Sequence, residues 1–278
     1  MNRSEALDRL RAQVAAGHPI IGAGAGTGLS AKCAEAGGAD LVTVFSSGRF
    51  RMAGRGSLAC LMPYGDANDI VVEMAGEVLP VAQQMPVLAG VCGTDPFRLM
   101  PVFLRQLKEI GFCGVQNHPT VGLIDGSFRR SLEETGMGFG LEIEMIRQAH
   151  ELDLLTCPFA FDPEQAKLMA DVGADLVVAH VGVTVGGMIG VATARVLEES
   201  VALIEAIRDA AIAANPEVLV LCHGGPLAEP PDVAYVFERT PGVVGFFGGS
   251  STERLPAERA ITEPTRRFKD IQLVDATT

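Results

Sequence analysis

The chain is 278 residues long, which is the usual size of one α/β barrel and short for two ordinary domains. It has 22 Lys+Arg against 34 Asp+Glu, a net charge of −12, and this argues against a nucleic-acid-binding protein because such proteins present a basic face. No apolar stretch is long enough to predict a membrane span, and the charged N-terminus does not resemble a signal peptide. Six well-separated cysteines favour buried, reduced thiols, so we expect a cytoplasmic globular protein.

Eight short, almost wholly apolar runs alternate with amphipathic segments along the chain. Such runs are typical of parallel strands that are covered on both faces. Eight strands, each followed by a helix, predict one (β/α)8 TIM barrel that spans 1–278 as a single domain. A helical lead-in over 1–17 and a helical tail over about 255–278 are expected at its ends. The predicted strands are 19–24, 41–45, 86–92, 114–117, 154–158, 176–181, 218–223 and 243–247.

The helices between these strands are predicted from apolar spacing and from start signals. Asp162 followed by Pro163 is typical of an N-cap with a first-turn proline, and Asp95 followed by Pro96 has the same form. A glycine-rich stretch over 22–28 contains neither a dinucleotide-binding G-x-G-x-x-G nor a Walker lysine, which favours the barrel over an open sheet. Longer helical patterns cover 97–110, 132–151 and 193–214.

In a barrel of this kind the site lies at the carboxyl ends of the strands, so polar residues that follow the apolar runs are candidates. His180 ends the sixth run and His223 ends the seventh, where partial burial makes an imidazole suited to proton transfer. Glu253 follows the eighth run and is the best carboxylate candidate, as a general base or metal ligand. Ordinary alternatives remain open, namely histidines buried in the core and a glutamate in the first turn of a helix.

The loops after the seventh and eighth strands predict an anion site. Glycine-rich turns expose backbone N–H groups, and the start of the following helix adds its positive dipole end. Serine hydroxyls supply further donors. The alternative is that the glycines only permit tight turns. The candidate phosphate-binding residues are Gly224, Gly225, Gly249, Ser250 and Ser251.

A third signal is a local excess of arginine. Between 41 and 65 the chain has Arg49, Arg51 and Arg55 and no acidic residue, in a protein whose net charge is −12. We expect this segment to be a glycine-containing loop at the mouth of the barrel, with Arg49 holding a carboxylate or a second oxyanion. Ser47 and Asn117 are further substrate-binding candidates. A solvated loop chosen for solubility is the alternative.

A metal site is not located by the sequence. Asp95, Asp125 and Glu144 carry suitable oxygens for a divalent ion such as Mg²⁺, but their spacing recommends no set of ligands. The metal ligands are therefore unknown, and no cofactor is assigned. The cysteines in the strands lack an activating partner in the sequence, which argues against a nucleophilic thiol.

Long segments of the chain resemble the phosphoenolpyruvate hydrolase-like family, also described as TIM-barrel signal transduction proteins. The resemblance covers nearly the whole chain. It implies a TIM barrel that is similar to phosphate-binding barrels, and an activity of the phosphonopyruvate or phosphoenolpyruvate hydrolase kind. The segments that carry it are 24–32, 47–58, 63–68, 91–97, 116–117, 119–126, 222–226 and 250–256.

The resemblance leaves the chemistry open. The phosphoenolpyruvate mutase and isocitrate lyase superfamily has an acidic metal-binding stretch and a Lys-Cys-Gly-His-type loop, and this chain has neither. Related domains fused to transcriptional activators imply a small-molecule sensor instead.

Three functions therefore compete. The first is an enzyme, hydrolase-like or a lyase or isomerase, that acts on a small phosphorylated or carboxylated metabolite. The second is a non-catalytic module that binds such an anion for signal transduction. The third is a structural scaffold whose strand ends are filled by ordinary packing. In each case the high apolar content favours a homo-oligomer.

Overall fold

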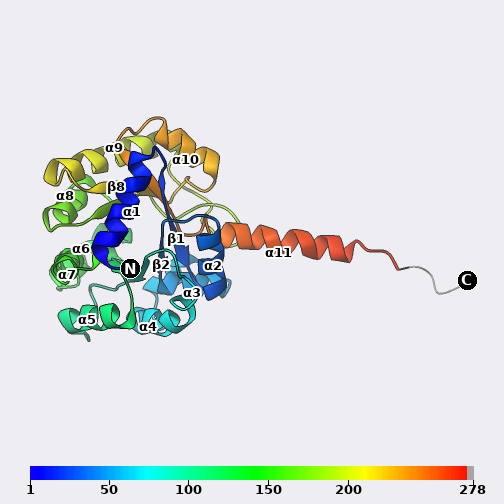
Figure 1. The fold of residues 1–278 in the computed structure, drawn as a ribbon, viewed down its shortest axis with the longest axis horizontal. Helices are drawn as coiled ribbons and strands as arrows, with labels where there is room; N and C mark the ends of the chain where they lie inside the picture. Colours follow the sequence, from blue (N-terminus) through cyan, green and yellow to red (C-terminus); the bar gives the residue numbers. More distant parts are fainter. Residues whose placement is uncertain (274–278) are drawn as a thin grey trace, which may run out of the picture.

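The computed structural model describes residues 1–273 and shows a (β/α)8 barrel whose strands are all parallel (Figure 1). Each of the eight predicted strands is confirmed within a few residues at its ends. The strands are β1 (Ile20–Ala25), β2 (Leu41–Val44), β3 (Val87–Gly90), β4 (Gly114–Gln116), β5 (Leu155–Thr156), β6 (Phe159–Ala160), β7 (Leu176–His180), β8 (Leu219–His223) and β9 (Val243–Gly248).

The barrel closes through a fifth strand that is divided in two. The strand order is β5-β4-β3-β2-β1-β9-β8-β7-β6, with β5 paired to β4 and β6 paired to β7. Only Cys157 and Pro158 separate the two halves, and Pro158 has no N–H to donate to a neighbouring strand. Its carbonyl nevertheless accepts from the N–H of Val178 at 2.8 Å, so the ladder continues across the break.

Helices cover the outside of this barrel. The predicted N-cap at Asp162 is confirmed, because its side chain accepts the N–H of Gln165 at 2.8 Å and Pro163 opens the helix. The helices are α1 (Arg3–Ala15), α2 (Gly28–Ala36), α3 (Ser46–Met52), α4 (Ala67–Val78), α5 (Met100–Ile110), α6 (Gly126–Glu134), α7 (Gly140–Glu151), α8 (Pro163–Asp171), α9 (Leu197–Ala214), α10 (Pro230–Phe237) and α11 (Arg254–Lys269).

Three helix predictions were wrong in their bounds. The helix expected at Asp95 begins at Met100, because the Asp95 carboxylate instead binds Asn68 and Arg98 and holds a turn. The helix expected over 132–151 is two helices, α6 and α7, divided at a segment that contains Gly136 with φ of +78°. The helix expected from residue 193 begins four residues later, as α9.

Glycines on β1 and β3 make room for large rings inside the barrel. A Cβ on Gly90 would lie 2.6 Å from the Phe45 ring and 2.9 Å from the carbonyl oxygen of His118. A Cβ on Gly22 would collide with the Phe247 ring. The rings that occupy this space form the floor of the barrel at its carboxyl end, where the site is expected.

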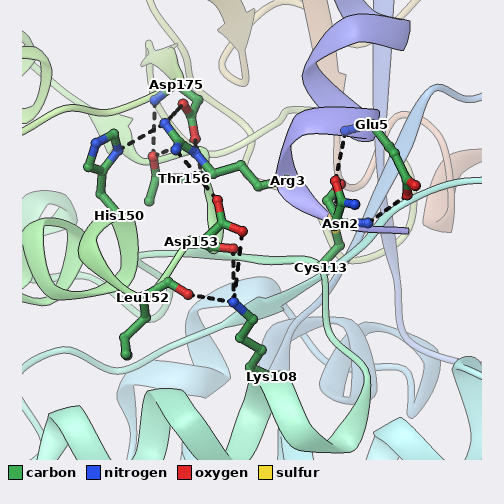
Figure 2. Close-up of polar contacts among 10 residues, drawn as sticks. All are labelled: Asn2, Arg3, Glu5, Lys108, Cys113, His150, Leu152, Asp153, Thr156 and Asp175. Atoms are coloured by element: carbon green, nitrogen blue, oxygen red, sulfur yellow. Dashed lines mark hydrogen bonds and ion pairs between the residues drawn. The ribbon is translucent and has the colours of Figure 1, made fainter.

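Helix α1 closes the opposite end of the barrel. Its residues Ala6, Leu7 and Leu10 are buried in the same apolar cluster as the barrel interior. Figure 2 shows how its first residue is held: Arg3 donates to both carboxylate oxygens of Asp175, at 2.6 and 2.9 Å, and to Nδ1 of His150. The helical lead-in predicted over 1–17 is thus present and plugs the barrel.

Helix α11 departs from the barrel pattern. It leaves the body beside α2 and α10 and points outward along its whole length (Figure 1). The predicted tail therefore begins as a helix, whereas its last five positions, 274–278, lie outside the described residues. Within residues 1–273, no helix is long and apolar enough to cross a membrane.

Candidate active site

A cavity opens at the carboxyl end of the barrel, where the fold predicts it. Its floor is aromatic, from Phe45 directly after β2 and Phe159 on β6. Its polar groups come from five different segments of the chain, which is typical of sites in this fold. The polar residues that line it are Ser47, Arg51, Ser57, His118, His180, Thr184, His223 and Ser250, and Gly249 contributes backbone.

Arg51 is the only charged side chain among the residues that line this cavity, and it is held by a buried ion pair. Its side chain is 4% exposed, and its Nε and Nη2 donate to Oε2 of Glu253 at 3.2 and 3.0 Å. The other oxygen of Glu253 accepts from the N–H of Gly26 at 2.5 Å and from Oγ of Ser30 at 2.6 Å. Each carboxylate oxygen of Glu253 thus accepts two hydrogen bonds. This leaves the carboxylate as the support of Arg51, with both oxygens engaged.

The remaining nitrogen of Arg51 faces a cluster of polar groups. Its Nη1 donates to Oγ of Ser47 at 3.2 Å, and the same hydroxyl lies 3.1 Å from Nε2 of His118. A guanidinium nitrogen, a hydroxyl and an imidazole thus converge at one wall. Donors in this arrangement suit an oxyanion, with Arg51 supplying the charge.

His180 and His223 stand next to each other, with ring centroids 4.6 Å apart, and their tautomers are opposite. The N–H of Gly182 donates to Nδ1 of His180 at 3.1 Å, so the proton of the neutral ring is on Nε2. In His223, Nδ1 lies 2.6 Å from the carbonyl oxygen of Phe247 and must donate to it, which leaves a lone pair on Nε2. At Nε2, one ring therefore offers a hydrogen-bond donor and the other a lone pair that can accept a proton.

Burial keeps these imidazoles neutral. It lowers the pKa of His223 to about 4, with the positive charge of Arg51 adding to the effect. The pKa of His118 falls to about 3, again first through burial and then through Arg51, and that of His180 lies well below its usual range for the same leading reason. A neutral ring is also the form of His180 that can accept the N–H of Gly182.

The structure brings together some of the predicted site residues. Ser47, His180, His223, Gly249 and Ser250 line the cavity. The predicted loop around Arg49 is instead the helix α3, on which Arg49 turns outward, is 36% exposed and pairs with Glu73.

Other predicted residues support the site from outside the cavity lining. Asn117 is buried and ties Glu142 to the backbone of Phe159, at 2.6 Å and 2.7 Å respectively. Gly225 donates its N–H to Gly182 at 2.8 Å, with φ of +55°. These contacts hold loops in place. Gly224, also with a positive φ, stands beside Gly225, and Ser251 lines a separate groove beside α10.

Four polar residues that line the cavity, Arg51, Ser57, His118 and Thr184, are absent from the predicted site. A helical interpretation of 46–52 would have found Arg51, because residues four apart share a helix face and Arg51 is four residues from Ser47. His118 lies two residues after the end of β4, where polar residues were expected, yet nothing in the sequence distinguishes it from Asn117 beside it.

Comparison with known proteins places this geometry in a family. A model of the phosphoenolpyruvate hydrolase-like family matches residues 5–271. The chain belongs to this family. It is 61% identical over 267 residues to the ToMV susceptible protein tm-1(GCR26) of Solanum lycopersicum, and this covers 96% of the chain and 35% of the relative. It is 32% identical over 273 residues to the putative transcriptional regulatory protein y4pA of Sinorhizobium fredii, or 97% of the chain and 44% of the relative. The chain thus spans less than half the length of these relatives.

Solved structures support the fold. A phosphonopyruvate hydrolase in complex with oxalate and Mg²⁺ has a TM-score of 0.61 at 15% identity, over 100% of this chain and 92% of the other. An oxaloacetate acetylhydrolase has a TM-score of 0.59 at 17% identity, over 98% and 91% of the two chains. Another neighbour, a 2,3-dimethylmalate lyase of the phosphoenolpyruvate mutase and isocitrate lyase superfamily, has a TM-score of 0.57 at 16% identity, and it shares the barrel fold.

The cavity does not fit Mg²⁺, which prefers carboxylate and water oxygens. No carboxylate lines it, and both oxygens of Glu253 are engaged by Arg51, Ser30 and the backbone. Among residues 1–273, no three His, Cys, Asp or Glu side chains are arranged to hold a metal ion. The earlier candidates lie elsewhere: Asp95 binds Arg98, and Glu144 pairs with Arg147.

Proposed function

We propose that the chain is an enzyme that binds a small carboxylated or phosphorylated metabolite in this cavity and transfers protons through neutral histidines. The observation that carries the proposal is the convergence of one buried arginine with two adjacent imidazoles of opposite tautomer. A pure binding site needs the arginine alone. A fixed proton donor beside a fixed acceptor is the requirement of general acid–base catalysis.

The residues have distinct roles in this proposal. Nη1 of Arg51 and the Ser47 hydroxyl bind the oxyanion of the substrate, and Glu253 holds the guanidinium in place from behind. Nε2 of His223 accepts a proton from the substrate or from an attacking water. Nε2–H of His180 donates a hydrogen bond to the departing group or to the developing oxyanion, and the proton taken up by His223 passes to the departing group. Ser250 and the backbone at Gly249 complete the wall, as the predicted anion site requires.

Membership of the phosphoenolpyruvate hydrolase-like family supports phosphoenolpyruvate and phosphonopyruvate as the first substrates to test. In this proposal hydrolysis of their C–O–P or C–P bond relies on the chain's own groups, because the cavity offers no carboxylate for Mg²⁺. The protein is proposed to act in the cytosol, which agrees with six cysteines that are all free thiols.

The test is turnover of these two compounds by the purified chain and by matched histidine variants. We expect His223→Gln and His180→Gln each to lower kcat/KM by roughly 10²–10⁴-fold, the range of general acid–base catalysis. His18→Gln, at an exposed histidine outside the cavity, is the control and should match the wild type. Unchanged turnover in His223→Gln would refute the assignment of the base.

The competing function is a binding module for signal transduction. Similarity to a putative transcriptional regulatory protein keeps it in the test. If either compound raises the Tm and is recovered intact after incubation, the chain binds it without converting it, and the binding function is favoured over the enzyme. Arg51→Lys should abolish the stabilisation in both cases, because the contact geometry depends on the guanidinium.

A further inference from the structure

Glu142 is a fully buried carboxyl group that lies outside the cavity. It belongs to the first turn of α7, and none of its surface is exposed. Burying a carboxylate is costly unless its oxygens are hydrogen-bonded, so the groups around this side chain decide whether it carries a charge. Those groups belong to the wall and the floor of the proposed active site.

The two oxygens of Glu142 hold two different parts of the site. Oε1 accepts the N–H of Val121, in the loop after β4, at 2.8 Å. Oε2 accepts from Nδ2 of Asn117 at 2.6 Å, and Oδ1 of Asn117 accepts the N–H of Phe159 at 2.7 Å. One side chain of α7 therefore connects the loop after β4 to the strand β6.

The loop that Glu142 holds carries one of the cavity histidines. His118 lies between Asn117 and Val121 in the chain, and both of these residues are bound by the carboxylate. Nε2 of His118 lies 3.1 Å from Oγ of Ser47, the hydroxyl that is proposed to bind the substrate oxyanion. The position of this imidazole is thus fixed from both sides by one buried group.

The second attachment leads to the other two histidines through Phe159. Its ring centroid lies 5.1 Å from that of His180 and 5.0 Å from that of His223, and it is 5.9 Å from the ring of His118. Close-packed interiors transmit displacements because they contain little free space. A shift of Phe159 would therefore alter the spacing between the proposed proton acceptor and the hydrogen-bond donor beside it.

The charge of Glu142 changes close to neutral pH. Burial raises the pKa of this carboxyl to about 7, although its hydrogen bonds and the positive charge of Arg129 on α6 oppose the rise. Arg129 is itself engaged, because it donates to the carbonyl oxygen of Val121 at 2.9 Å and pairs with Glu133 at 2.7 Å. The Cys92 thiol, after β3, also lies within electrostatic reach, and it stays neutral because burial raises its pKa.

Protonation of Glu142 disturbs both attachments. The N–H of Val121 and Nδ2 of Asn117 are donors, and the amide of Asn117 is fixed in this orientation because its oxygen accepts from Phe159. A proton on either carboxyl oxygen competes with one of these donors, and loss of the charge weakens the other bond. The loop and the floor are then held less firmly.

We propose that Glu142 is a positioning residue of the active site, whose carboxylate form fixes the loop after β4 and the Phe159 floor and so keeps the cavity histidines in their geometry. This deepens the proposed function and rests on it, because the imidazoles that are positioned are those proposed to act on the substrate. Activity should then decline with falling pH in a range above that in which the buried histidines themselves take up protons.

The first test is the pH profile of kcat/KM between pH 8 and 6. In the wild type kcat/KM should fall by about tenfold per pH unit below 7, because only the carboxylate form is active. Glu142→Gln should lower kcat/KM at pH 8 by roughly 10–10²-fold and abolish the decline near pH 7. Glu151→Gln, on the same helix with a side chain that is 61% exposed, is the control and should keep the wild-type profile. A decline near pH 7 that persists in Glu142→Gln would overturn the proposal.

Unfolding is not expected to imitate this decline. The pKa of Glu142 is about 7 in the folded chain, against 4.5 for an ordinary glutamate, so the folded chain takes up this proton first and is stabilised by it as the pH falls from 7 toward 4.5. The buried histidines act in the opposite direction, but only below about pH 6.5. Circular dichroism at each pH checks that the chain stays folded.

A double substitution tests the hydrogen bonds rather than the carboxyl alone. Asn117→Asp combined with Glu142→Gln exchanges the two groups, so the new amide donates to the new carboxylate. The N–H groups of Val121 and Phe159 keep their acceptors, and only the 3.3 Å bond from Asn117 to the carbonyl oxygen of Phe159 is lost. We expect the double variant to recover much of the kcat/KM that Glu142→Gln loses. A double variant no more active than Glu142→Gln would argue against positioning through these bonds.

A measurement without substrate separates this proposal from the proposed function. The chain is labelled with ¹⁵N-histidine, and the Nε2 signals of His118, His180 and His223 are followed by NMR between pH 8 and 6. In the wild type they should shift together with a midpoint near pH 7, and in Glu142→Gln they should not. This result supports the positioning role even if neither test compound is turned over. Signals that stay fixed in the wild type would overturn the proposal, whether or not Glu142→Gln folds, and would leave the proposed function intact.

Discussion

Glu253→Gln tests whether the buried ion pair holds the site together. The substitution keeps size and shape and removes the charge. In one orientation the new amide NH₂ would face the Arg51 guanidinium, and in the other it would face the N–H of Gly26 and the Ser30 hydroxyl. Neither orientation satisfies both sides. Glutamine therefore leaves a buried arginine without its counter-charge.

The magnitude follows from burial. The two side chains of this pair are 4% and 1% exposed, and breaking a buried pair by removing one partner costs about 3–5 kcal/mol. For a chain of this size that corresponds to a fall in Tm of roughly 10 °C. Glu73→Gln makes the same chemical change in the pair with Arg49, whose two side chains are 36% (Arg49) and 70% (Glu73) exposed. It should cost less than about 1 kcal/mol.

The measurement is urea unfolding followed by far-UV circular dichroism, since the chain has no Trp to report by fluorescence. Replacing both members, as in Arg51→Met with Glu253→Leu, should recover much of the lost stability while anion binding stays absent. A Glu253→Gln protein within 1 kcal/mol of the wild type would show that Arg51 does not depend on this carboxylate.

Three further predictions concern pH, packing and the far end of the barrel. The buried histidines stay neutral in the folded chain because their pKa values are lowered, but they take up protons near pH 6.5 in the unfolded chain. The free energy of unfolding should therefore fall as the pH drops from about 6.5 toward 4, by up to about 1.4 kcal/mol per pH unit for each histidine. Urea midpoints that do not change between pH 7 and 5 would contradict this. Gly90→Ala should destabilise by about 1–3 kcal/mol through collision with Phe45, whereas Gly76→Ala, with open space on a helix, should stabilise by about 0.5–1 kcal/mol. Asp175→Asn should lower Tm, as measured by calorimetry, and leave anion affinity in the cavity unchanged, because the Arg3 network lies at the opposite end of the barrel.

The strands were predictable because parallel strands covered on both faces are apolar runs, and no other element of this chain has that form. The bounds of the helices were less predictable. The Asp95-Pro96 pair has the local form of an N-cap, but a long-range contact with Asn68 uses its carboxylate, and sequence spacing carries no information about that contact. The same limit explains why Glu253 was interpreted as a catalytic candidate. Its role is set by Arg51, 202 residues away in the chain.

The arginine of the site shows a different limit. The local excess of positive charge lies in the segment that contains Arg51, which lines the cavity, but the sequence predicts a loop there, in which any arginine can turn inward. In α3 the helical periodicity determines which side chains face the cavity. Arg51 and Ser47 lie on that face, whereas Arg49 turns outward and pairs with Glu73. Identifying the short helix would have been enough to choose between them.

Two neighbouring residues connect the root of α11 to opposite walls of the cavity. Glu253 binds Arg51, and Arg254 binds the loop after β7, which contributes Thr184 to the lining. The start of α11 is thus bonded to two parts of the cavity wall. Because both contacts are made from the start of α11, any change in the position of one of these walls is energetically coupled to the position of the helix.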